Sequence, residues 1–168
     1  MKKIFLVCLL FICLFFISGC GRQVNSNNSN NSNNNYINVE ANKDGKIVID
    51  TESIGSDAAF VNYKVSGVTI QCIVVRGPDG VVRIAYNTCQ ACNPSPRAYF
   101  VQHGEYLVCQ NCGNKFHIDK VGIEKGGCNP TVVEEKEVTD DKIILDKSYV
   151  DTYKDKFENW EGPISKIG

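Results

Sequence analysis

The sequence predicts a small, mainly β domain with a C-terminal helix, behind a leader and a polar linker. Three observations lead to this fold class. Short segments rich in β-branched residues alternate with turns containing Gly or Pro over residues 46–145. Two Cys-x-x-Cys pairs stand where expected strands end, and aromatic residues recur at helical spacing near the C-terminus. The roughly 130 residues from position 36 to 168 are enough for one domain with its own core.

The first nineteen residues have the pattern of a signal peptide for lipid attachment. Two lysines precede an unbroken apolar run over 4–16, which is shorter than the roughly 20 residues that span a membrane. The run leads into ISGC, residues 17–20, which resembles a bacterial lipobox. We therefore expect residues 1–19 to be removed and Cys20 to carry a lipid that holds the protein at the extracytoplasmic face of the cell membrane. An uncleaved anchor or an ordinary signal peptide is the alternative.

Residues 20–35 are expected to form a tether between the lipid and the domain. Positions 25–35 contain only Asn and Ser. Such a segment has no apolar side chain whose burial could offset the entropy lost on ordering. The folded domain is therefore expected over 36–168.

Eight segments in this domain have the alternation or the β-branched composition of strands. They are 46–50, 58–65, 68–76, 81–86, 98–102, 105–108, 131–138 and 142–145. Tight hairpins are expected at Ser66-Gly67 and His103-Gly104. Pro78-Asp79-Gly80 forms a further turn, in which Pro presets φ and Gly accepts a positive φ.

The C-terminal segment predicts a helix. Tyr149, Tyr153, Phe157 and Trp160 follow one another at intervals of four, four and three, which places them on one helical face. Ser148 is a candidate N-cap. An aromatic stripe of this kind is typical of core packing rather than of a cofactor site.

Composition excludes several classes of function. Without the two leader lysines the chain has 16 basic and 19 acidic residues, a formal charge of −3, and it has no strongly basic stripe. We therefore expect no nucleic-acid partner. The sequence also has no Ser-His-Asp set, catalytic carboxylate pair or phosphate-binding loop, so we expect a binding or redox protein rather than an enzyme.

Six of the nine cysteines remain after the leader and the lipidated residue are set aside. They are Cys72, Cys89, Cys92, Cys109, Cys112 and Cys128. The spacing Cys-x2-Cys-x16-Cys-x2-Cys over residues 89–112 falls inside the template for four-cysteine metal sites. Each pair lets two thiolates face one ion while loop amides face the sulfurs. Gly113, and less readily Asn93, can supply the positive φ that such a loop requires after its second cysteine.

The four paired cysteines fit zinc, mononuclear iron or an iron–sulfur cluster, and their spacing does not choose among these. Disulfides are the alternative, because an even number of cysteines outside the cytoplasm also fits a disulfide framework. Cys128, in a Gly-Gly-Cys-Asn-Pro turn, is a candidate fifth sulfur. Cys72 lies inside an apolar strand and is expected to be a buried core residue. His117 is a weaker candidate ligand, and His103 is expected to be solvated.

Three blocks resemble one protein family. They are Cys89-x-x-Cys92 after Asp79-Gly80 and residues 82–86, then Cys109-x-x-Cys112-Gly113-x-x-Phe116, then Gly126-Gly127-Cys128-Asn129-Pro130. In this order they resemble the membrane iron–sulfur containing FtrD-like family, over roughly residues 46–157.

The resemblance implies an extracytoplasmic iron–sulfur module with Cys89, Cys92, Cys109 and Cys112 as ligands and Cys128 as the family's extra cysteine. It also implies an association with ferrous-iron uptake, beside a permease and a cupredoxin-like partner. Two departures stand out. Many relatives carry several membrane helices where this chain has a lipid anchor, and Asn87-Thr88 replaces an acidic residue and Ala.

A fainter likeness extends to Rieske proteins, whose second cluster loop is Cys-x-x-His-Gly-x-x-Phe. Here Cys112 stands where that His would be, and the first loop does not match. The expected fold is therefore a Rieske-like or rubredoxin-like β domain. The expected function is electron transfer through an iron–sulfur centre, serving iron uptake or respiration with a redox or permease partner. The alternatives are a zinc-stabilised binding module and a thiol–disulfide redox lipoprotein.

Overall fold

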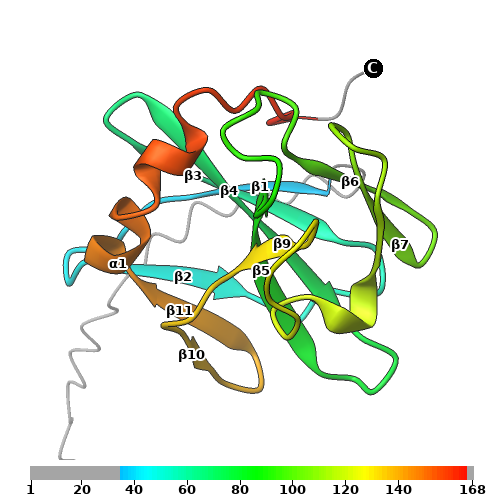
Figure 1. Ribbon diagram of the computed structural model, residues 1–168. Coiled ribbons are helices and arrows are strands. Elements are labelled where there is room, and N and C mark those ends of the chain that lie inside the picture. The colour runs from blue at the N-terminus through cyan, green and yellow to red at the C-terminus, as the bar shows by residue number, and fades with distance from the viewer. Residues whose placement is uncertain (1–34, 166–168) are drawn as a thin grey trace, which may run out of the picture.

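The computed structural model describes residues 35–165, and these residues form a mainly β domain, as predicted (Figure 1). The predicted signal peptide, Cys20 and all but the last residue of the tether lie outside the described residues. Within the described part, no helix is both long enough and apolar enough to cross a membrane. The strands form one five-stranded sheet and two three-stranded sheets.

The five-stranded sheet has the order β1-β3-β4-β5-β9. Its strands are β1 (Tyr36–Val39), β3 (Ala59–Val65), β4 (Val68–Arg76), β5 (Val82–Cys89) and β9 (Pro130–Val132). The predicted hairpin between β3 and β4 is confirmed: Val65 pairs with Val68, and Ser66 and Gly67 both have positive φ. β1 was not predicted, and it pairs with β3 in parallel.

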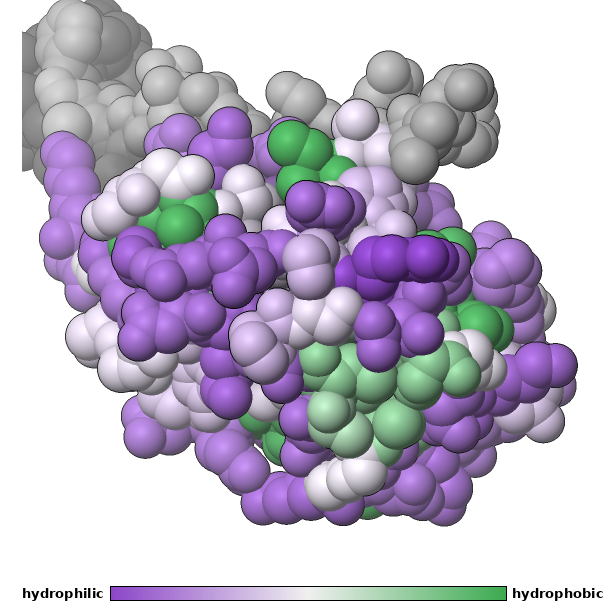
Figure 2. Space-filling view, turned by 45° about the horizontal axis from the view of Figure 1, so that its top comes forward, coloured by the Kyte–Doolittle hydropathy of each residue, from purple (hydrophilic) through white to green (hydrophobic). Residues whose placement is uncertain are grey.

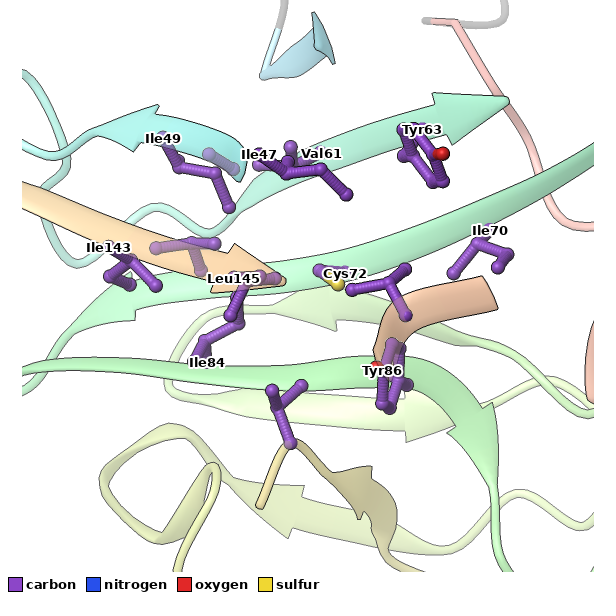
Figure 3. Packing of buried hydrophobic residues seen from close by; sticks show 14 of the residues in the cluster. Ile47, Ile49, Val61, Tyr63, Ile70, Cys72, Ile84, Tyr86, Ile143 and Leu145 are labelled. Atoms are coloured by element: carbon purple, nitrogen blue, oxygen red, sulfur yellow. The ribbon is translucent and has the colours of Figure 1, made fainter. Parts of the chain in front are cut away.

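The second sheet packs on one face of the five-stranded sheet. It has the order β10-β11-β2, from β2 (Lys46–Asp50), β10 (Glu137–Val138) and β11 (Lys142–Asp146). Figure 3 shows Ile47, Ile49, Ile143 and Leu145 of this sheet facing side chains of β3, β4 and β5. This layer is the first of two cores.

The third sheet packs on the opposite face. It has the order β6-β7-β8, from β6 (Phe100–His103), β7 (Tyr106–Cys109) and β8 (Lys115–His117). The second core lies here, around Phe60, Ile73, Phe100 and Leu107. Because side chains alternate between faces, β3, β4 and β5 contribute to both cores, and this explains their almost continuous apolar composition.

The predicted strand over 131–138 was wrong in extent. It is divided into two strands: β9 joins the five-stranded sheet, and β10 joins the second sheet. The exposed residues Glu134 and Glu135 lie between the two strands, where the chain passes from one sheet to the other. The sequence pattern does not show this change of sheet, because both pieces retain β composition.

The predicted C-terminal helix is present only as two short pieces, α1 (Lys147–Asp151) and the 3₁₀ helix η2 (Lys154–Phe157). Asp146 is the N-cap, not Ser148, and it makes no side-chain cap hydrogen bond. Backbone bonds three residues apart, such as Thr152 N to the Tyr149 carbonyl, tighten the chain between the pieces. The aromatic residues nevertheless pack inward, and the ring centroid of Tyr153 lies 4.2 Å from that of Tyr86.

The surface carries only scattered large apolar side chains. Figure 2 shows one face that is mostly hydrophilic, with one contiguous patch of moderately hydrophobic residues and smaller hydrophobic spots among polar residues. The exposed large apolar residues in the described part are Val48, Val81, Tyr106, Ile123, Val138 and Ile164.

Candidate metal centre

Three loops bring five cysteines together. Cys89 ends β5 and Cys92 follows in the β5–β6 loop, while Cys109 ends β7 and Cys112 follows in the β7–β8 loop. Cys128 lies in the segment between the 3₁₀ helix η1 (Ile118–Lys120) and β9. The strands therefore deliver the first cysteine of each pair, and the loops deliver the other three.

The five sulfurs form two overlapping groups. Those of Cys89, Cys92 and Cys109 all lie within 4.8 Å of one another, as do those of Cys92, Cys112 and Cys128. The Cys92 and Cys109 sulfurs are 3.9 Å apart, and those of Cys112 and Cys128 are 3.4 Å apart. A tetrahedral site with metal–sulfur bonds of about 2.3 Å separates its sulfurs by about 3.8 Å. Within each group of three, the thiols are thus spaced closely enough to bind one ion.

The two Cys-x-x-Cys loops share one local backbone pattern. Asn93 N donates to the Cys89 carbonyl at 3.0 Å, and Gly113 N donates to the Cys109 carbonyl at 2.8 Å. The amides of residues 91 and 92 also donate to the Cys89 sulfur, and those of residues 111 and 112 donate to the Cys109 sulfur. The expectation that loop amides face the sulfurs is confirmed.

The residues after the two loops behave differently. Gly113 has φ +75°, as predicted. Asn93 does not have the positive φ suggested for it, because Ser66 is the one non-Gly residue of the described part in that region. Asn93 instead fixes its loop through its side chain, which donates to Thr88 Oγ1 at 3.0 Å and to the Lys156 carbonyl at 2.6 Å.

The thiols differ in electrostatic environment. Burial raises the pKa of Cys89 and of Cys109 above the ordinary thiol value, although loop amides oppose that rise. A hydrogen bond from Asn114 N lowers the pKa of the exposed Cys112 to about 7. The contact with Cys112 raises the pKa of Cys128 to about 11. The site therefore has a buried side and a solvent side.

Cys128 is held beside the two pairs by side-chain amides. Gln90 N donates to the Asn129 carbonyl, and Gln90 Oε1 accepts from Gly126 N at 2.9 Å. From the second loop, Asn114 Nδ2 donates to the Cys128 carbonyl at 3.0 Å. Both pairs thus anchor the third loop, which places the candidate fifth sulfur at the site.

The C-terminal segment braces the first loop. Trp160 Nε1 donates to the Asn87 carbonyl at 2.8 Å, two residues before Cys89. Glu161 N donates to the Pro96 carbonyl at 2.9 Å, on the far side of the same loop. Sequence reasoning placed Trp160 in the core and missed this contact.

A row of amide side chains, buried at Asn62, Gln71 and Asn87 and exposed at Asn38, leads from β1 to the first loop. Asn87 Nδ2 donates to Gln71 Oε1, Gln71 Nε2 donates to Asn62 Oδ1, and Asn62 Nδ2 donates to Asn38 Oδ1. Asn87 also accepts from Phe100 N at 2.7 Å and donates to the Phe100 carbonyl at 3.2 Å. One sequence feature could have indicated this row, because each of the apolar strands β3, β4 and β5 contains one amide residue.

The remaining candidates lie outside this sulfur cluster. Cys72 is buried in the first core, beside Leu145 and Tyr86 (Figure 3), as predicted, and burial raises the pKa of its thiol to about 12. His117 belongs to neither sulfur group, and its Nδ1 lies 2.7 Å from Asp119 Oδ1. His103 is exposed at its hairpin tip, as expected.

These features define a small β domain with a thiol-rich metal centre built at the ends of two strands and one adjoining loop. Comparison with known proteins then identifies the family. The model of the membrane iron–sulfur containing protein FtrD-like family matches residues 54–157, so this chain belongs to that family. No curated protein and no solved structure gives a significant match. The Rieske-like or rubredoxin-like detail of the expected fold stays a prediction.

Proposed function

We propose that the protein is a lipid-anchored, extracytoplasmic electron carrier that holds an iron–sulfur centre on its clustered cysteines. The observation that carries the proposal is the convergence of five thiols in a chain of the FtrD-like family. Thiolates are the usual ligands of such clusters, and N–H donors to their sulfurs are among the features that set cluster potentials. The amides that face Cys89 and Cys109 provide such donors here.

Cys89, Cys92 and Cys109 would hold the buried side of the centre, and Cys112 or Cys128 the exposed side. An iron–sulfur centre would supply one-electron redox chemistry. The chain's own contribution is to fix the thiols at the ends of β5 and β7 and to shield Cys89 and Cys109 from water, with exposures of 0% and 1%. A solvent-facing edge at Cys112 gives a redox partner a short approach to the centre.

The apolar run over 4–16 and the ISGC sequence support removal of residues 1–19 and attachment through Cys20. The proposed partner is a membrane redox protein or a ferrous-iron permease at the same surface. Metabolic labelling with a clickable palmitate analogue tests the anchor. The wild-type chain should be labelled and Cys20→Ala should not. Equal labelling of both would contradict the anchor.

Metal analysis of the full chain, extracted from membranes in detergent without oxygen, tests the centre. Iron with acid-labile sulfide and a visible chromophore bleached by dithionite would support the proposal, and Cys109→Ala should lose that chromophore. Cys72→Ala is the matched control, because Cys72 lies in the other core. If neither the wild-type chain nor the Cys72→Ala control contains metal, and few thiols are free before reduction, the proposal is contradicted. That result would favour thiol–disulfide chemistry.

A zinc-stabilised module is the second candidate. The observation that favours it is that each of the two sulfur groups places three thiols within 4.8 Å of one another, as ligands of a single ion require. One zinc per chain in a colourless protein would support this function over electron transfer.

A further inference from the structure

The site has one more thiol than a four-coordinate ion needs. Tetrahedral thiolate sites take four sulfurs, whereas five converge here. The sulfurs of Cys89, Cys92 and Cys109 form one group of three, and those of Cys92, Cys112 and Cys128 form the other. An ion bound by the first group therefore lacks one ligand, and two thiols lie ready to supply it.

Burial distinguishes two of the five thiols as fixed ligands. Cys89 and Cys109 are buried at the ends of strands. Cys92 and Cys128 are half-buried, Cys112 is exposed, and Cys92 belongs to both sulfur groups. The first group is therefore anchored by its two buried thiols, while Cys112 and Cys128 are more accessible to solvent.

Cys112 and Cys128 are both close to Cys92, a member of the first group. The sulfurs of Cys112 and Cys128 are 3.4 Å apart, and both lie within 4.8 Å of the Cys92 sulfur. Asn114 Nδ2, two residues from Cys112, donates to the Cys128 carbonyl and keeps the two loops in register. A Cβ added at Gly113, Gly126 or Gly127 would meet nothing within 4 Å, so the glycines of both loops border open space.

We propose that Cys112 and Cys128 share the fourth ligand position and exchange at it. The inference rests on the proposed function only in requiring a bound metal. In the exchange, the Cys128 thiol loses its proton and its sulfur bonds to the metal as the bond to Cys112 breaks. The released Cys112 thiolate takes up the proton, so no electron and no net charge is transferred. The exchange would keep the number of sulfurs on the metal constant, whichever of the two thiols is bound.

Cobalt(II) binding tests this arrangement independently of the native metal. The full-length chain in detergent, reduced and freed of metal, is titrated with Co²⁺, and the thiolate-to-cobalt charge-transfer absorbance is measured per bound ion. That absorbance is proportional to the number of coordinated thiolates. The variants are Cys112→Ala, Cys128→Ala, the double variant, Cys109→Ala and the control Cys72→Ala. Circular dichroism confirms that each is folded.

Each of Cys112→Ala and Cys128→Ala should keep the full charge-transfer absorbance, while the double variant and Cys109→Ala should fall to about three quarters of it. A fall in only one of the two single variants would overturn the proposal by showing a fixed fourth ligand. A fall in both would overturn it by showing that all five sulfurs bind. A wild-type chain without thiolate charge transfer would overturn it as well. If native metal analysis shows no iron and sulfide but the cobalt pattern holds, the proposed function fails and this inference stands.

Discussion

The two Cys-x-x-Cys loops are alike in sequence and in local backbone hydrogen bonding, but they are held in different ways. The first loop is braced from outside its own hairpin, by Trp160, by the Lys156 carbonyl and by the amide row that ends at Asn87. The second is held by its own turn at Gly113, by the bond from Gln110 N to the Tyr99 carbonyl, and by side-chain bonds to the other two cysteine loops. In those bonds Asn111 Oδ1 accepts from Ser95 Oγ, and Asn114 Nδ2 donates to the Cys128 carbonyl.

This difference shows that a motif specifies local geometry while its surroundings decide rigidity. Repeated loops with the same spacing would be expected to respond alike to substitution. Here the first loop depends on residues far along the chain, and the second depends on a backbone conformation and on the other cysteine loops. The predictions below test this contrast.

Asn87→Ala is expected to have the largest effect on stability. It leaves Phe100 N and Gln71 Oε1 without their partner in a buried region, which should cost about 2–4 kcal/mol of unfolding free energy. Asn114→Ala, in the exposed second loop, is the matched control and should cost less than about 1 kcal/mol. Urea unfolding followed by the fluorescence of Trp160, the single tryptophan, measures both. Equal losses would contradict the contrast.

In the reduced, metal-free chain, iodoacetamide should alkylate Cys112 of the second loop at least about ten times faster than Cys89 of the first loop. Cys112 is exposed and has a pKa of about 7, whereas Cys89 is fully buried with a raised pKa. Iodoacetamide reacts with the thiolate, so the Cys112 rate should rise through pH 7 and level off above it. The Cys89 rate should still be rising there. Mass spectrometry resolves each cysteine, and equal rates at pH 8 would refute the contrast.

Gly113→Ala should destabilise the second loop by about 1–2 kcal/mol, since an L-residue at φ +75° is strained. The added Cβ meets nothing within 4 Å, so backbone conformation is the cause rather than a clash. The equivalent change in the first loop, Asn93→Ala, should act through the lost side-chain bonds to Thr88 and Lys156. Asn93→Gly separates the causes: it should be as harmful as Asn93→Ala, because Asn93 does not have a positive φ and loses the same side-chain bonds. A gain in stability for Asn93→Gly would show instead that the first loop requires a positive φ, as the second does.

Trp160→Phe should have the smallest effect on stability, about 1 kcal/mol, because it removes one hydrogen bond to Asn87 but can keep the ring contacts with Tyr99 and Phe157. Circular dichroism with urea measures the loss. The same variant should raise the alkylation rate of Cys92 and leave that of Cys112 unchanged. A uniform rise at both cysteines would show a general loosening instead of a brace on the first loop.

Much of this fold follows from sequence, because alternation and turn residues are local properties. The strand over 68–76 and the hairpin at Ser66-Gly67 were predicted with the bounds observed. β1 was missed because its pairing with β3 is parallel and joins segments twenty-four residues apart. The helix was overestimated because an aromatic stripe indicates which residues pack inward, not whether the backbone between them stays helical.

The site was predictable in composition but not in assembly. The spacing of the two pairs pointed to a metal centre, and the structure brings all four cysteines together. That Cys128 joins them depends on Gln90 and Asn114, whose bonds link separate loops. The amide row depends on strand register, which places Asn38 opposite Asn62 and Asn62 opposite Gln71. Neither the bonds between loops nor the pairing of amides across strands can be recognised from a local sequence pattern.

The amide row also has a direction. Asn87, Gln71 and Asn62 each donate a side-chain N–H to the oxygen of the next amide in the direction of β1. The backbone fixes this sense, because Phe100 N requires an acceptor at Asn87, and the Pro163 and Ile164 carbonyls require donors at Gln71 and Asn62. No single amide can turn over without losing such a bond. Asn62, Gln71 and Asn87 therefore each have one fixed orientation, and the hydrogen-bonded row can form in only one sense.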